Sequence, residues 1–271
     1  MTRFIILLTS LALILSACQE GAKTDAEKET TETTASADKA PLKYTLTPFT
    51  PSPSYPDATI ENVEMKDGAF SFTLNESSYK LGAQTEDAPR KNCANSDKGQ
   101  HIHVLINDNP YAARYTAQFS DLKVPDGDHY MLAFLSRSYH ESIKTDKAHT
   151  AMKMSVKDKS IQKAEPVADP MVWYSRPKGN YKGKANTDKV MLDFYLLNTN
   201  ISATGNKVKA EINDEVHLLD KWQPYYVEGL PMGKNKITLS LLDKDGNLVK
   251  TAQNPISREF TLQEDIAEKT E

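Results

Sequence analysis

Apolar and polar residues alternate in short runs along most of this chain, and turn-forming residues separate the runs. Alternation with a period of two gives each run one core-facing side, which is typical of β-strands, and no stretch of the sequence shows a sustained helical period. Eight runs are predicted to be strands: Ala69–Leu74, His101–Ile106, His129–Leu135, Ala151–Val156, Val190–Leu197, Lys207–Ile212, Lys236–Leu242 and Arg258–Leu262. The Asp-Gly pairs of Lys66–Gly68, Pro125–Gly127 and Asp245–Gly246 indicate tight turns between them. The pattern therefore predicts an all-β fold.

One part of this pattern occurs twice. The segment His101–Asp108 (HIHVLIND) aligns with Lys207–Asp214 (KVKAEIND). Further along, Phe119–Leu135 aligns with Val227–Leu241 when a gap of two residues is allowed. Two similar units of about 100 residues are typical of tandem immunoglobulin-like β-sandwiches.

The chain has 271 residues, of which 39% are hydrophobic and 26% charged, and its net charge is −4. This composition supports a folded protein with a core, and the mild negative charge argues against nucleic acid as a partner. We predict two tandem immunoglobulin-like β-sandwich domains at 43–160 and 165–264, joined by a polar segment with two prolines and followed by a disordered tail, 265–271.

The N-terminus has the features of a signal peptide, residues 1–17, with one positive charge followed by the apolar run Phe4–Leu15. This run is shorter than the about 20 residues of a membrane span. Leu15-Ser16-Ala17-Cys18 resembles the bacterial lipoprotein signal, which implies that Cys18 is lipidated and becomes the mature N-terminus. Gln19 lacks the aspartate that retains such proteins in the inner membrane, so the resemblance favours the outer membrane. A plain secretory signal is the alternative.

Residues 18–42 are rich in Thr, Ala, Glu and Lys and contain no aromatic residue, which predicts a disordered tether. Once Cys18 is lipidated, Cys93 has no internal partner and is a free or an intermolecular thiol. The sequence has no Gly-x-Ser-x-Gly motif, and Cys93 lies in a polar loop. We therefore expect no enzymatic activity. An envelope hydrolase is a third possibility, beside the binding module and the metal-binding protein considered below.

The second copy acts as an internal control for the first. Apolar residues at 208, 210 and 212 mark the core face there, so by alignment His101, His103 and Leu105 face outward in the first copy. Phe134 and its alternating neighbours face outward in the next strand, where the second copy has polar residues. The resulting candidate contact surface consists of His101, His103, Tyr130, Leu132, Phe134 and Arg176. Such a patch is covered or used, so either the second copy packs on it or a ligand or partner binds there. An error in the alignment is the third alternative.

The histidines are also candidate metal ligands. His101 and His103 would lie about 7 Å apart on one strand face, and imidazole suits copper and zinc. The second copy has Lys207, Lys209 and Asn235 at the positions of His101, His103 and His129. The predicted ligands are His101, His103 and His129, with His140 as the alternative third. Ligands of the kind that copper(I) prefers follow at His149, Met152 and Met154. Exposed or hydrogen-bonded histidines are the alternative to a metal site, and both methionines fit a core face.

Two loops have alternatives of their own. The segment Trp173–Lys184 (WYSRPKGNYKGK) could dock anionic sugars or phosphates, or its aromatic residues could pack against the first copy. The segment Asp243–Asn247 (DKDGN) resembles part of a calcium loop but lacks the glutamate at position 12, and a hairpin turn is expected there.

Over nearly its whole length the chain resembles a family of lipoproteins from Bacteroidetes-type bacteria with tandem immunoglobulin-like modules, including YSRPKGNYKG (Tyr174–Gly183) and KWQPYYVEGLPMG (Lys221–Gly233). The resemblance implies the cellular location and the fold, but no chemical activity. We predict a lipid-anchored outer-membrane protein that acts as a non-enzymatic binding module without a cofactor, its partner an unknown protein or small molecule. The alternative is a metal-binding envelope protein that uses copper or zinc.

Overall fold

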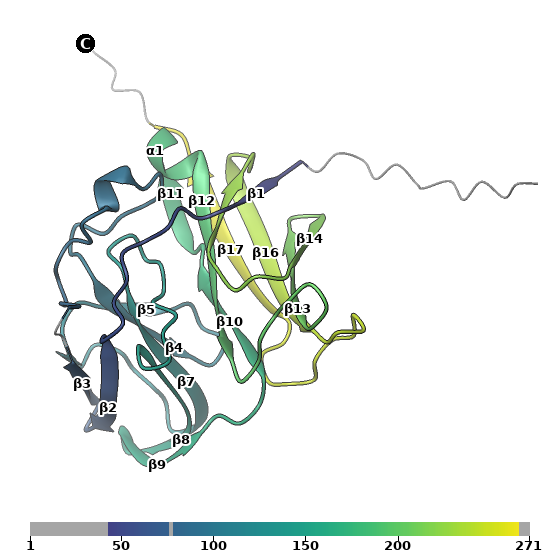
Figure 1. Ribbon diagram of the computed structural model, residues 1–271. Coiled ribbons are helices and arrows are strands. Elements are labelled where there is room, and N and C mark those ends of the chain that lie inside the picture. Colours follow the sequence, from purple (N-terminus) through teal and green to yellow (C-terminus); the bar gives the residue numbers. More distant parts are fainter. Residues whose placement is uncertain (1–42, 76–77, 266–271) are drawn as a thin grey trace, which may run out of the picture. The chain divides into compact units, whose positions relative to one another are not determined.

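The computed structural model describes residues 43–75 and 78–265 (Figure 1). The predicted signal peptide, Cys18, the tether and nearly all of the predicted tail lie outside the described residues. Among the described residues, no helix is long and apolar enough to cross a membrane.

The first sandwich is formed by two antiparallel sheets. One sheet has the order β2 (Thr59–Lys66), β3 (Ala69–Asn75), β6 (Gln118–Phe119). The other has the order β5 (Ala112–Arg114), β4 (His101–Ile106), β7 (Gly127–Ser136), β8 (His149–Lys157), β9 (Ser160–Pro166). A short 3₁₀ helix, Ala88–Arg90, lies in the long connection between β3 and β4.

The second sandwich also has two sheets. The first has the order β1 (Thr45–Pro48), β15 (Tyr225–Glu228), β12 (Lys189–Leu197), β10 (Met171–Arg176). The second has the order β11 (Gly179–Lys182), β17 (Ile256–Gln263), β16 (Gly233–Leu242), β13 (Lys207–Ile212), β14 (Glu215–Leu219). A single helical turn, α1 (Lys184–Thr187), follows β11. The predicted all-β sandwich class is confirmed, and each of the eight predicted strands is present.

The chain does not keep the two sandwiches fully separate. β1 comes before every strand of the first sandwich, yet it pairs with β15 of the second, and Figure 1 shows it beside those strands. Much of the predicted joint between the domains is the hairpin of β8 and β9, in which Lys157 pairs with Ser160. The domain limits 43–160 and 165–264 stay a prediction, and residues 45–48 depart from them.

Each sandwich has its own apolar core. In β13 the alternation buries Val208, Ala210 and Ile212 completely, and they pack with the inward residues of β10, β12, β16 and β17. The equivalent residues of β4, Ile102 and Val104, lie in the other core. Burying one aliphatic side chain of this size contributes about 1.5–3 kcal/mol, so the alternation itself selects the inward face.

A third apolar cluster joins the two sandwiches. It combines Leu105, Tyr111, Leu132 and Phe134 of the first sandwich with Met171, Trp173, Tyr195 and Leu197 of the second. Phe134 stacks on Tyr195, with ring centroids 5.1 Å apart. β4 and β10 are consequently buried on both faces.

This interface corrects the candidate contact surface. His101, His103, Leu132 and Phe134 have no exposed area, and Arg176 is 5% exposed. Tyr130 is half-buried and packs against the same interface cluster. The patch is apolar because the second sandwich covers it, which is one of the three alternatives that the sequence offered.

The two copies share their strand register. His103 pairs with Phe134 between β4 and β7, and Lys209 pairs with Ser240 between β13 and β16. The sequence alignment of the repeat is therefore confirmed at the level of individual residue pairs.

A candidate three-histidine metal centre

Three histidine rings meet at the edge of the interface between the sandwiches. His101 and His103 lie on β4, and His140 lies in the turn that follows β7. Nε2 of His101 is 2.9 Å from Nε2 of His103 and 3.0 Å from Nδ1 of His140. One nitrogen from each ring lies within 4.8 Å of the other two.

The interface positions the two strand histidines. Their spacing of two residues puts both rings on the outward face of β4, which the second sandwich buries. The His103 ring is stacked on Tyr111 with centroids 3.6 Å apart and planes 10° apart, and Phe134 flanks it at 5.0 Å. The His101 ring contacts Tyr115, with centroids 4.9 Å apart. This packing holds both rings in place.

His140 is positioned by an unusual turn. Its φ angle is +69°, a left-handed conformation that bulky residues rarely adopt. The second copy forms the same turn with Gly246 there, at φ +84°. The backbone N–H of His140 donates to Arg137 and that of Gly246 donates to Asp243. Comparing Arg137–Glu141 with Asp243–Asn247 in the sequence would have shown histidine in a glycine position.

His101 presents a lone pair to the other two rings. Its Nδ1 lies 2.8 Å from the carbonyl oxygen of Gly99. A carbonyl oxygen only accepts, so Nδ1 carries the proton and Nε2 of the neutral ring is unprotonated. A backbone carbonyl that orients a ring in this way is common behind metal-binding histidines.

All three rings are held in the neutral form that binds metals. Burial lowers the pKa of His101 to about 4. Burial also lowers the pKa values of His103 and His140 well below the usual range, and the charges of Arg176 and Lys178 act in the same direction. The cluster is therefore uncharged at neutral pH.

The spacing suits a metal ion. Zinc–nitrogen bonds of about 2.0–2.1 Å place tetrahedral ligand nitrogens about 3.3 Å apart. The two short separations in the cluster, 2.9 and 3.0 Å, need to open by a few tenths of an ångström, and the nitrogens of His103 and His140, which lie within 4.8 Å of each other, need to reach a similar spacing. Three protein ligands leave the fourth position of a tetrahedral ion open.

Two cations border the cluster. The Arg176 guanidinium is 5% exposed, and its Nη2 donates to the Tyr181 hydroxyl at 2.6 Å. The Lys178 ammonium donates to the carbonyl of Tyr111 at 2.6 Å and lies 3.8 Å from the centre of that ring. Burial lowers the pKa of Lys178 to about 8. The anion-docking loop of the sequence prediction thus turns two of its cations toward the interface, while Lys182 and Lys184 are exposed.

His129 is not part of the cluster, which corrects the predicted ligand set. Its Nδ1 is 3.0 Å from the Asn107 side chain and its Nε2 is 2.8 Å from the carbonyl of Pro125. Asn235 of the second copy makes the equivalent bonds to Asn213 and to the carbonyl of Pro231. His129 therefore fills a structural position that the other copy fills with asparagine.

The soft ligands also lie elsewhere. Met154 is buried in the first core, and Met152 packs against the same core. The ring of His149 contacts Tyr195 at the interface, with centroids 5.0 Å apart. The expected contribution of these three residues to a copper site is therefore corrected: the two faces of β8 direct the methionines into the first core and His149 into the interface.

Cys93 is a buried free thiol. Burial raises its pKa to about 12, so it is protonated at neutral pH and a poor nucleophile. The segment Asp243–Asn247 is a hairpin turn, as expected, in which the Asp243 carboxylate accepts from the backbone N–H groups of Asp245 and Asn247.

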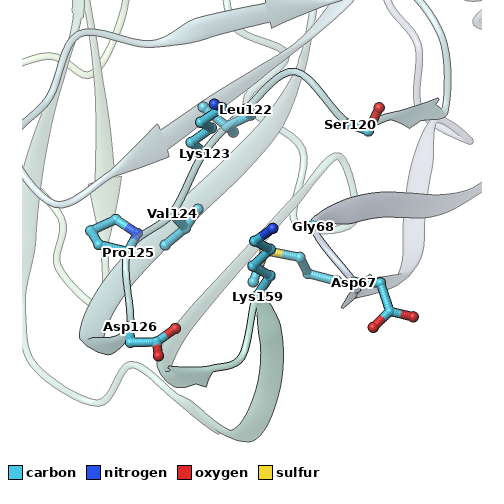
Figure 2. Close-up of a pocket in the computed structure, with 10 residues that line it drawn as sticks. Asp67, Gly68, Ser120, Leu122, Lys123, Val124, Pro125, Asp126 and Lys159 are labelled. Carbon is cyan, nitrogen blue, oxygen red and sulfur yellow. The ribbon is translucent and has the colours of Figure 1, made fainter.

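A surface pocket of about 500 Å³ lies beside the β2–β3 turn (Figure 2). Its charged groups come from turns and loops and have both signs: Asp67, Lys123, Asp126 and Lys159. It shares no residue with the histidine cluster.

No family model matches this chain, and no curated protein matches it. Among solved structures, it is similar to the fibronectin(III)-like modules of Clostridium thermocellum CbhA, with 16% identity over 35% of this chain and 100% of that chain and a TM-score of 0.27. The central fibronectin-III array of RIM-binding protein gives 10% identity over 79% and 69%, with a TM-score of 0.25.

A third similar structure is SGBP-B of the Bacteroides ovatus mixed-linkage glucan utilization locus, solved with a mixed-linkage heptasaccharide. Its identity is 11%, over 80% of this chain and 47% of that chain, with a TM-score of 0.18.

Proposed function

We propose that this protein is a non-enzymatic binding protein of the bacterial envelope whose ligand is one zinc or copper ion, held by His101, His103 and His140. The observation that carries the proposal is the convergence of three buried, neutral imidazoles, with nitrogen separations of 2.9 and 3.0 Å. The lipoprotein signal that ends at Cys18 supports an outer-membrane address, with the lipid as the membrane contact.

Hydrogen bonding among the rings is a poorer account of this arrangement. Nε2 of neutral His101 has one lone pair in the ring plane, yet ring nitrogens of both His103 and His140 approach it. The two approaches therefore have to share one lone pair, which is weaker than two separate, well-aligned hydrogen bonds. A cation between the rings turns all three nitrogens into favourable ligands.

The second copy supports the same conclusion. At equivalent positions it has Lys207, Lys209 and Gly246, so the sandwich forms without any of the three histidines. Holding His140 at a positive φ is costly, by about 1–3 kcal/mol for such conformations, and they cluster at binding sites.

The test is a competition titration of the EDTA-treated protein with Zn²⁺ and, under reducing conditions, Cu⁺. We expect one equivalent of metal per chain. His140→Gly should weaken binding at least 100-fold while keeping the fold, because glycine is the residue that the second copy uses in this turn. His129→Asn is the matched control, since Asn235 makes the same contacts, and its affinity should be unchanged. Failure to bind a stoichiometric metal, or equal affinity in His140→Gly, would refute the proposal.

A further inference from the structure

The Arg176 guanidinium is the least satisfied buried charge near the histidines. It ends β10 and is 5% exposed. Nη2 donates to the Tyr181 hydroxyl, whereas Nε and Nη1 have no hydrogen-bond partner among the described residues. None of the ion pairs in residues 43–75 and 78–265 includes Arg176.

Unpaired nitrogens on a buried guanidinium are unusual because they lose their hydration and gain no acceptor in return. Arginine at such positions normally meets a carboxylate or another anion. Two unpaired nitrogens therefore point to an anionic acceptor that the chain itself does not supply.

The position of Arg176 connects it with the histidines. The preceding residue, Ser175, has its hydroxyl 3.5 Å from Nδ1 of His103. Lys178, two residues further on, lies over the Tyr111 ring, whose stacking partner is His103. The β10 end therefore brings two positive charges to the border of the histidine cluster.

These charges bear on what a metal ion at this site needs. Three neutral imidazoles leave the whole charge of the metal uncompensated, and the candidate ligand group contains no carboxylate. In a buried site of low polarity, repulsion between that charge and the two cations is strong. An anion at the open fourth position would offset this repulsion. It would also give the unpaired nitrogens of Arg176 an acceptor.

We propose that the site takes up a metal–anion pair, in which a small monovalent anion completes the coordination of the metal and accepts a hydrogen bond from Arg176. This inference rests on the proposed metal-binding function. It assigns Arg176 a binding role and Lys178 a supporting electrostatic one.

The experiment uses Co²⁺ as a spectroscopic substitute for the metal and azide as the anion. Azide added to the Co²⁺-loaded protein should change the visible absorption spectrum in a saturable way. Arg176→Gln should retain Co²⁺ and weaken azide binding at least tenfold. Lys182→Gln removes a positive charge from the exposed part of the same loop and should bind azide like the wild type.

The outcomes separate the two proposals. If neither Co²⁺ nor the Zn²⁺ and Cu⁺ of the previous titration bind, the metal-binding function itself is refuted. If Co²⁺ binds but azide leaves the spectrum unchanged, or binds Arg176→Gln equally well, only the anion site is refuted. Should Arg176→Gln fail to fold, Lys178→Gln replaces it, with azide binding expected to be about threefold weaker and unchanged binding counting against the proposal.

Discussion

The strand pair β4–β7 of the first sandwich and the pair β13–β16 of the second have the same frame and different outer faces. Lys207, Lys209 and Glu211 of β13 are partly exposed, while the residues at the equivalent positions of β4 are fully buried. Even the turn after each first strand is the same, with Asn107 and Asn213 at φ angles of +52° and +50°. One backbone arrangement therefore carries a solvated face in one copy and an interface in the other.

The difference shows what determines the outer face of a strand. The inward residues are apolar in both copies because each sandwich needs a core, whereas the outer face depends on what packs against it. In the first copy β10 and β12 pack there, and the imidazoles lie where that contact ends. A candidate site has thus formed at the covered face, and its counterpart remains solvated.

Truncating an interface residue should give the largest effect. Phe134→Ala removes a fully buried ring that stacks on Tyr195, and we expect a loss of about 3–5 kcal/mol in the free energy of unfolding. Lys236→Ala changes the exposed outer face of β16, at the position equivalent to Tyr130, and should stay within about 0.5 kcal/mol. Urea unfolding measures both. Equal losses would mean that the interface adds no stability.

The second largest difference is expected in the stability that ion pairs contribute in the two regions. Asp193 of β12 is fully buried, pairs with Lys144 at 2.6 Å and accepts from the backbone of Ser142. Asp193→Ala leaves a poorly solvated ammonium and should cost about 3 kcal/mol. Glu211→Ala breaks the half-exposed pair with Lys209 in the second copy and should cost less than about 1 kcal/mol. Similar costs in urea unfolding would contradict the structural contrast.

Acid should destabilise the metal-free protein through the buried histidines. The pKa of His101 is about 4 in the folded state against an ordinary value of 6.5, so the unfolded chain binds more protons between these values. The contribution of His101 to the free energy of unfolding is fully present above pH 6.5. It falls as the pH decreases toward 4, by about 1.4 kcal/mol per pH unit.

His101→Gln should remove this dependence. The variant should therefore lose less unfolding free energy than the wild type between pH 6.5 and 5, by up to about 2 kcal/mol. The measurement is urea unfolding in EDTA at several pH values for both proteins. A parallel pH profile in His101→Gln would show that this ring does not titrate below its ordinary pKa.

The smallest effect is expected from transplanting the strand histidines. Lys207→His with Lys209→His, made in the His140→Gly background, rebuilds the two-residue spacing on β13. That face is half-exposed and its turn has Gly246, so zinc affinity should remain at least 100-fold below that of the wild type. A restored affinity would mean that the strand pair suffices, without interface or third ring.

Local signals in the sequence predicted much of the fold. Strict alternation located the eight strands, and the two copies of the Asn-Asp turn identified the repeat with the correct register. These features depend on a strand's own two faces and on turn residues, so a short segment contains them. β1 was missed as a partner of β15 because a four-residue strand has little pattern of its own.

The candidate site was predicted only in part. His101 and His103 were identified because the second copy shows that the fold does not need them. His129 was the wrong third residue, since its equivalence to Asn235 is visible only as a pair of hydrogen bonds. His140 was an alternative, and its selection needed the folded turn to bring it to His101.

The sequence by itself therefore determined the all-β class, the repeated unit and the inward faces of β4, β7, β13 and β16, because these follow from periodicity and local turn chemistry. Only the tertiary structure decided that the aromatic face of the first copy is an interface and that three histidines from two segments converge at its edge. Those contacts join residues far apart in the chain, and their energies depend on shape and burial that no single segment encodes. The same burial keeps the imidazoles neutral and leaves two nitrogens of Arg176 without an acceptor, so the chemistry of the candidate site is a product of the packing.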